Sequence, residues 1–286
     1  MKKILVPTDF SKVSENAVKF ALALAEKMYG EITLFHSVKF DYFYDFQYGD
    51  LGAISAATEE IRKDAEKRME DFIEQFKSDI NINFTISSEP IASGIKDMVS
   101  NDGFDLVVVG THGSSGLEEV FIGSNAERVV RHIQCPVITI PKNVSLKPIR
   151  KVLVPIDLSE LRGGFLTRIA NLQAIFECEL EFLWVNKSKV SDEQEKELAN
   201  ELTSVFKSYE LDNYRFFIIN SINPQDGIFL EAKESKVDMV AMATHARRGI
   251  AHWLSGSTTE DTINHLDIPV WTFKIDKTEE VIKLKK

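Results

Sequence analysis

The sequence predicts an α/β protein made of two tandem domains, each with a five-stranded parallel sheet flanked by helices. The length of 286 residues suits two domains, since a domain usually holds roughly 100–200 residues. An internal repeat supports this division, because residues 3–11 (KILVPTDFS) return as residues 151–159 (KVLVPIDLS). Short Val- and Ile-rich runs alternate with longer helical patterns, and parallel strands need such crossover helices.

A second pair of matching segments closes each half of the chain. Thr111-His112, Gly123-Ser124 and Cys135-Pro136-Val137 correspond to Thr244-His245, Gly256-Ser257 and Ile268-Pro269-Val270. Proline and polar residues interrupt the apolar pattern at 141–150, directly before the second copy begins. We therefore expect domains at 1–146 and 147–286.

Each element of the first half follows from its hydrophobic pattern. The apolar runs predict strands at 3–6, 32–37, 83–86, 106–110 and 137–140. Helices are expected at 11–29, 57–76, 92–100 and 124–132. The first of these helices has one apolar face, because Ala17, Phe20, Ala21, Leu24 and Met28 recur at spacings of three and four.

The second half repeats this plan. We expect its strands at 151–155, 180–185, 215–219, 237–243 and 270–273, and its helices at 159–176, 192–208, 224–235 and 258–265. Parallel sheets of this kind bind ligands at the carboxyl ends of their strands. Asp9, Ser37 and Gly110 fall at such ends in the first half.

Composition limits the partners and the compartment. The formal net charge of -10 argues against binding to nucleic acid or to an anionic membrane surface, and Lys283, Lys285 and Lys286 are interpreted as a solvated tail. Cys135 and Cys178 lie in different halves without metal-type spacing, which indicates a reducing, cytoplasmic setting. Neither a secretory leader nor an apolar stretch of about 18 residues is recognisable, so we expect no export and no membrane span.

The glycine-rich segment 106–128 (LVVVGTHGSSGLEEVFIGSNAER) contains the most specific chemical signal. Gly113 and Gly123 allow positive φ angles, and Ser124 is a good N-cap for a helix that presents free N–H groups. Such a loop and helix start suit a phosphate group. The spacing matches neither a P-loop nor the dinucleotide fingerprint, so an ordinary loop with a helix cap is the alternative.

Gly110, Gly113, Gly123 and Ser124 match the pattern Gly-x-x-Gly, nine residues, Gly-Ser. This pattern resembles the nucleotide motif of the universal stress protein family, as do the opening ILVPTDFS and the closing AERVVRH and CPV. The resemblance covers nearly the whole chain in two copies, and it implies two tandem UspA-like domains. These would have a Rossmann-like fold of the adenine nucleotide alpha hydrolase-like type, with a role in the stress response.

The resemblance also implies a site for ATP, or for AMP or ADP, with Mg²⁺ accompanying the nucleotide. The residues expected to bind it are Pro7, Thr8, Asp9, Ser37, Val109, Gly110, His112, Gly113, Gly123, Ser124 and Asn125. Asp9 has a second interpretation, because an aspartate before Ser11 can simply stabilise the helix start. Ser37 departs from the family, whose binding members usually carry valine there, and we expect a modest loss of affinity.

The second copy departs further from this motif, because Ala243 and Ala246 replace both early glycines. We expect a weak or empty site there, although Arg247 and Arg248 offer an altered way to hold a phosphate. The resemblance implies that the halves form an intramolecular pseudo-dimer through strands 137–140 and 270–273. A homodimer and an unidentified protein partner are further expectations.

Catalysis is not expected beyond a slow hydrolysis of ATP. His112 has no nucleophile or orienting carboxylate near it in the sequence, and the scattered histidines lack metal-ligand spacing. An interaction scaffold that binds no nucleotide is the alternative function, since residues 40–48 (FDYFYDFQY) are rich in aromatic side chains that anchor interfaces. The same segment also suits a lid over the pocket or a satellite hydrophobic cluster.

Overall fold

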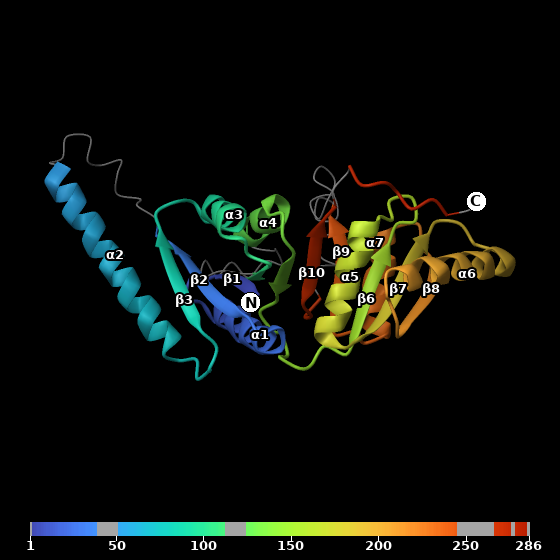
Figure 1. Cartoon of the computed structure of the whole chain (residues 1–286), viewed down its shortest axis with the longest axis horizontal. Helices are drawn as coiled ribbons and strands as arrows, with labels where there is room; N and C mark the ends of the chain where they lie inside the picture. Colours follow the sequence, from blue (N-terminus) through green and yellow to red (C-terminus); the bar gives the residue numbers. More distant parts are fainter. Residues whose placement is uncertain (1, 39–50, 112–123, 245–265, 276–277, 285–286) are drawn as a thin grey trace.

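The computed structural model describes residues 2–38, 51–111, 124–244, 266–275 and 278–284. Its strands form one ten-stranded sheet in the order β3-β2-β1-β4-β5-β10-β9-β6-β7-β8 (Figure 1). The first half supplies β1 Lys3–Pro7, β2 Glu31–Ser37, β3 Ile82–Ser87, β4 Leu106–Gly110 and β5 Val137–Ile140. The second half supplies β6 Lys151–Ile156, β7 Glu179–Asn186, β8 Tyr214–Asn220, β9 Met239–Thr244 and β10 Val270–Lys274.

The strand pairing confirms the expected fold class. Every pair within a half is parallel, whereas β5 and β10 pair antiparallel with Ile138 opposite Trp271. This seam joins the two sheets edge to edge through the strands that the resemblance indicates. Because both of these strands are interior in the joined sheet, their backbone groups are paired on either side.

The helices also follow the expected order. They are α1 Lys12–Met28, α2 Leu51–Ile73, α3 Ile91–Asp102, α4 Ser124–His132, α5 Gly163–Phe176, α6 Asp192–Ser208 and α7 Pro224–Glu234. Two starts differ from expectation by more than one residue, since α2 begins at Leu51 instead of residue 57 and α5 begins at Gly163 instead of residue 159. The helix expected at 258–265 lies outside the described residues.

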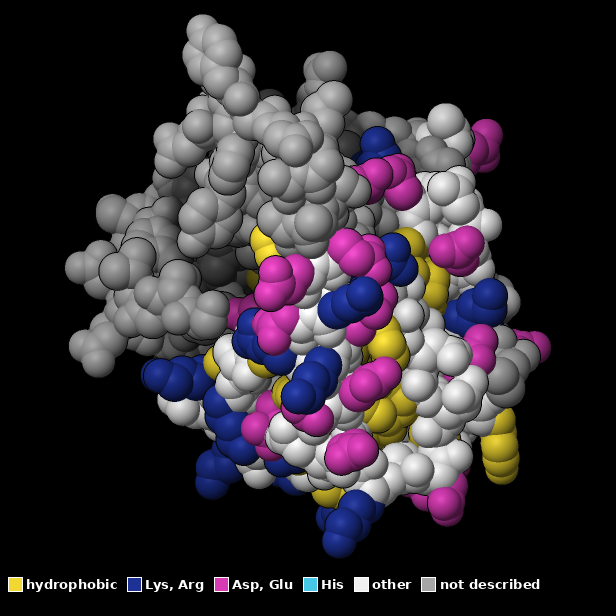
Figure 2. Space-filling model, turned by 90° about the vertical axis from the view of Figure 1, so that its left-hand side faces the viewer, with side chains coloured by type: hydrophobic (Ala, Val, Ile, Leu, Met, Phe, Trp, Pro, Cys, Tyr) yellow, Lys and Arg dark blue, Asp and Glu magenta, His cyan; other side chains and the backbone are white. Residues whose placement is uncertain are grey.

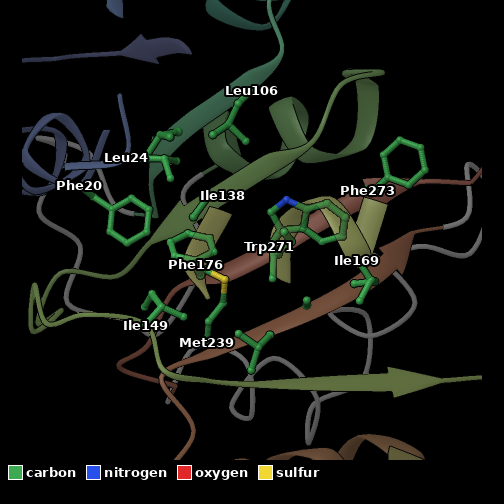
Figure 3. Packing of buried hydrophobic residues seen from close by; sticks show 14 of the residues in the cluster. Phe20, Leu24, Leu106, Ile138, Ile149, Ile169, Phe176, Met239, Trp271 and Phe273 are labelled. Atoms are coloured by element: carbon green, nitrogen blue, oxygen red, sulfur yellow. The ribbon is translucent and has the colours of Figure 1, made fainter. Parts of the chain in front are cut away.

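The core is shared on one face of the sheet and divided on the other. On the shared face, α1, α2, α5 and α6 bury one continuous cluster, and Phe20 of α1 reaches Phe176 of α5 with ring centroids 6.5 Å apart (Figure 3). On the opposite face, α3 and α4 cover a cluster of the first half, and α7 covers a separate cluster of the second. Burial of α1 and α5 against each other therefore adds a hydrophobic contact to the β5–β10 seam.

Each half fixes the start of its first strand with an aspartate from the loop before its fourth strand. Asp105 accepts a hydrogen bond from Lys3 N at 3.0 Å, and its own N–H donates to Lys3 O. Asp238 makes the same pair of contacts with Lys151 and also accepts from Arg150 N at 2.9 Å. The repeat thus extends to a specific hydrogen-bond arrangement.

The outer surface at the end that carries α2 and β3 has mixed charge. Figure 2 shows acidic and basic side chains alternating over this end of the molecule. Some of them pair along α2, where Arg62 lies 3.0 Å from Glu66 and Lys63 lies 3.8 Å from Glu59. Within the described ranges, no helix combines the length and the apolar character that crossing a membrane requires.

Candidate functional site

The expected site residues of the first half gather at one edge of the sheet. Strand β1 lies between β2 and β4, and all three run parallel. Pro7, Ser37 and Gly110 end these strands, so the residues that follow them share this edge. His112, Gly113 and Gly123 lie outside the described residues.

Thr8 organises the loop after β1. Its side chain is 2% exposed, its backbone N–H donates to Phe35 O at 2.9 Å, and its Oγ1 donates to Ser14 Oγ at 3.0 Å. The same Oγ1 accepts from Phe10 N at 3.0 Å. Thr8 and the buried Pro7 therefore fix the position of the loop after β1.

Asp9 stabilises the start of α1. Its Oδ1 accepts a hydrogen bond from Ser11 N at 3.1 Å, and Ser11 in turn caps the helix by accepting from Ser14 N at 3.2 Å. This geometry matches the turn interpretation of Asp9. The side chain is only half-buried.

An aromatic and basic cluster that sequence reasoning missed supports the loop from the side of α2. Phe10 has a left-handed backbone with φ 64, its ring lies 4.5 Å from that of His36, and the Arg68 guanidinium lies 4.6 Å above it. A non-glycine residue with positive φ is uncommon and costs energy. No local sequence signal joins Phe10 to Arg68, because long-range packing brings them together.

His36 ties the first two strands to this loop. Its Nδ1 lies 2.8 Å from Thr8 O, so the neutral ring donates a hydrogen bond there. Burial lowers the pKa of His36, and the nearby Arg68 lowers it further, against the opposing effect of the bond to Thr8. The imidazole is therefore held neutral as a structural donor.

The remaining described residues complete the edge. Gly110 packs against α1, and a Cβ at this position would lie 2.7 Å from Val13 Cγ1. Val109 is buried beneath it, while Ser37 Oγ donates to Glu89 O at 2.6 Å. Helix α4 begins at Ser124, and Asn125 is exposed in its first turn, where free N–H groups favour an anion.

The second half forms a different edge at the equivalent position. A cavity of about 300 Å³ lies there, and its lining includes Pro155, Ile156, Asp157, Val185, Met242 and Ala243, the counterparts of the first-half residues. Asp157 repeats the turn of Asp9, since its Oδ1 accepts from Ser159 N at 2.9 Å. Ile156 replaces the polar Thr8, so this edge is more apolar.

The C-terminal segment 278–284 packs beside this second cavity. Glu279 Oε2 accepts a hydrogen bond from Gly164 N at 2.8 Å at the start of α5, and Ile282 N donates to Leu161 O at 2.8 Å. Ile282 and Leu284 pack on the shared core. Lys283 is exposed, as expected, and Lys285 and Lys286 lie outside the described residues.

The first-half edge is chemically suited to holding a ligand. It combines an aspartate, hydroxyl groups and the first turn of a helix. Among the residues that the structure describes, no group of three or more His, Cys, Asp or Glu side chains is arranged to hold a metal ion.

Comparisons with known proteins agree with this architecture. The family model described as "Universal stress protein family" matches residues 1–141 and again residues 148–274. Universal stress protein MJ0531 of Methanocaldococcus jannaschii is 32% identical over 142 residues, which cover 49% of this chain and 82% of that protein. Universal stress protein Sll1388 of Synechocystis is 29% identical over 148 residues, which cover 48% of this chain and 96% of that protein.

A solved structure extends the similarity over both halves. The universal stress protein from Archaeoglobus fulgidus superposes with a TM-score of 0.69 at 20% identity, and 97% of each chain is covered. At this identity the likeness establishes the fold alone. Taken with the two matches of the family model, it leads to one conclusion: the chain belongs to the universal stress protein family and carries two copies of its domain.

Proposed function

We propose that the first half binds an adenine nucleotide, ATP or its products AMP and ADP, together with Mg²⁺. The observation that carries the proposal is the shared edge of β2, β1 and β4, which brings Asp9, Ser37 and Gly110 together. The glycine motif continues from Gly110 to Ser124, where α4 begins. Phosphate oxygens would accept from backbone N–H groups there, as at other helix starts.

The second half would serve mainly as a structural partner. Its cavity lining carries Ala243 in place of Gly110 and the carboxylate Glu160 in place of Lys12, and an added negative charge disfavours a phosphate chain. Its β10 strand completes the sheet of the first half at β5. We therefore expect one nucleotide per chain.

Calorimetric titration of ATP with Mg²⁺ tests this proposal. The intact chain should bind one equivalent, and a Gly113→Val, Gly123→Val double variant should lose it because valine side chains would block the approach of phosphates to the backbone. Gly256→Val, at the second-half counterpart of Gly123, is the matched control and should keep full stoichiometry. Circular dichroism checks that each variant is folded.

The alternative is an interaction scaffold that needs no nucleotide. Ala243 in the second half and the replacement of valine by Ser37 in the first half favour it, because both alter the motif. Absence of heat and of any thermal shift when ATP is added to the intact chain would reject nucleotide binding in favour of the scaffold. Retained binding in the double variant would reject the assignment to the first-half motif.

A further inference from the structure

A second cavity, of about 510 Å³, lies between the two halves. Helix α1 and the residues before β1, β4 and β5 form one wall, and α5 with Trp271 of β10 forms the other. Lys2, Asp105 and Pro136 precede their strands, so the crevice lies at the amino ends of the first-half strands. The candidate nucleotide site lies at their carboxyl ends, and the two sites are therefore separate.

The floor of the crevice is apolar. Leu24, Leu106, Ile138, Phe176 and Trp271 line it, and all of them belong to the cluster shared by the two halves (Figure 3). Each of these side chains is at most 9% exposed. An apolar floor with a few polar groups, in a volume of about 300–1,000 Å³, is typical of sites for small organic ligands.

Arg168 supplies a half-buried cation to the crevice, and the carboxylate of Glu279 acts on it electrostatically. Its guanidinium lies 4.0 Å above the ring of Phe273, and no carboxylate in the described ranges forms an ion pair with it. Burial lowers the pKa of Arg168, although an arginine keeps its charge at neutral pH. A half-buried guanidinium that has lost part of its hydration gains from a bound anion.

The other polar groups of the crevice also favour a negatively charged ligand. Lys27 and Asn171 lie on its rim, and neither forms an ion pair or hydrogen bond with a described residue. The indole N–H of Trp271 is likewise a donor without an acceptor in the described part of the chain. Two acidic residues line the crevice. The Asp105 carboxylate forms an ion pair with Lys2 Nζ at 2.7 Å, whereas the exposed Glu177 forms no ion pair with a described residue.

We propose that this crevice binds a small carboxylate with an aromatic or short alkyl body. Its acid group would lie on Arg168, with Lys27 adding positive charge at the rim, and its apolar body would pack on Leu24, Phe176 and Trp271. The net charge of -10 repels anions from the surface as a whole, so such a ligand is held by these local donors. Because both halves contribute a wall, the ligand would stabilise their association at the seam.

Fluorescence of anilinonaphthalene sulfonate, an anion with an apolar body, tests the site on the intact chain. The dye should bind with one saturable site, and octanoate should displace it much more effectively than octanol, which has a similar alkyl body but no charge. Arg168→Gln should weaken dye binding by about tenfold, the cost of losing a charge-assisted contact. Arg62→Gln, on the exposed face of α2, is the matched control and should leave binding unchanged.

Two further measurements separate this site from others. Saturating ATP with Mg²⁺ should not displace the dye, and displacement would overturn the assignment to the crevice. Should Arg168→Gln fail to fold, Lys27→Gln provides the second test, with an expected loss of about threefold for an exposed cation. Equal displacement by octanol and octanoate, or full dye affinity in both variants, would also overturn the proposal.

Discussion

The two halves of the molecule share their sheet topology and differ at the edge where a ligand would bind. In the first half, Ser11 caps α1, which begins at Lys12. In the second half the corresponding helix begins about one turn later, at Gly163, and Glu279 from the C-terminal segment accepts from its first turn. The two halves therefore share the same fold, but they differ in where the first helix begins and in which polar groups lie at the edge of the sheet.

A second difference lies under the loop after the first strand. Thr8 and Ser14 form a buried pair of hydroxyl groups in the first half, and Ile156 and Arg162 replace them in the second. Arg162 points to the C-terminal segment, where its guanidinium donates to Glu279 O. Polar groups near the second edge thus bond to the C-terminal segment of the same chain. This difference supports the assignment of nucleotide binding to the first half.

The largest expected effect concerns the aspartate that fixes the first strand in each half. Asp238→Ala should lower the free energy of unfolding by about 3 kcal/mol, because the N–H groups of Arg150 and Lys151 both lose their acceptor. Asp105→Ala should cost less, about 2 kcal/mol, because Asp105 accepts from one backbone N–H and is more exposed. Urea denaturation of both variants measures the difference, and a larger loss for Asp105→Ala would contradict the expected order.

The same pair predicts sensitivity to acid. Burial opposes ionisation of Asp238, but the bonds from Lys147, Arg150 and Lys151 outweigh it, so the pKa of Asp238 lies below its ordinary value. For Asp105, burial likewise raises the pKa, but the hydrogen bonds from Lys2 and Lys3 outweigh it, so this pKa also lies below its ordinary value. Their stabilisation is complete above the ordinary value of 3.8 and is lost as pH falls through the lower folded value. Each alanine variant should therefore lose less stability than the parent over this acidic range.

The next effect concerns Gly110, which the second half replaces with Ala243. Gly110→Ala should destabilise the chain by about 1–2 kcal/mol, because its Cβ would lie 2.7 Å from Val13 Cγ1 and 3.2 Å from Val13 C. The reverse exchange, Ala243→Gly, should cost about 0.5–1 kcal/mol through backbone entropy alone. Denaturation midpoints of the two variants give the comparison. A neutral Gly110→Ala would show that this glycine is not required by the packing of α1.

Sequence reasoning recovered the fold because the repeat and the apolar patterns are local and strong. It gave no strand order, and it gave the β5–β10 seam only through the family resemblance, since pairing partners are far apart in the chain. It missed the later start of α5, because Ser159 N donates to Asp157 in a turn that precedes the helix. It also missed the cluster of Phe10, His36 and Arg68, which depends on contacts between α2 and β2.

The smallest expected effect distinguishes the halves by pH, since Trp184 stands where the first half has His36. Burial holds the pKa of His36 below its ordinary value of 6.5, so the unfolded chain binds a proton more readily than the folded chain as pH falls below 6.5. The contribution of His36 to stability is therefore complete above that pH and declines as the medium becomes more acidic.

His36→Gln keeps a donor for Thr8 O and removes the titration, so its stability should change less between pH 7 and pH 5.5 than that of the parent. In an NMR titration of the folded chain, His36 should protonate below its ordinary pKa of 6.5. Identical pH profiles for parent and variant would show that the first-half loop does not depend on a neutral imidazole, and this distinction between the two halves would fail.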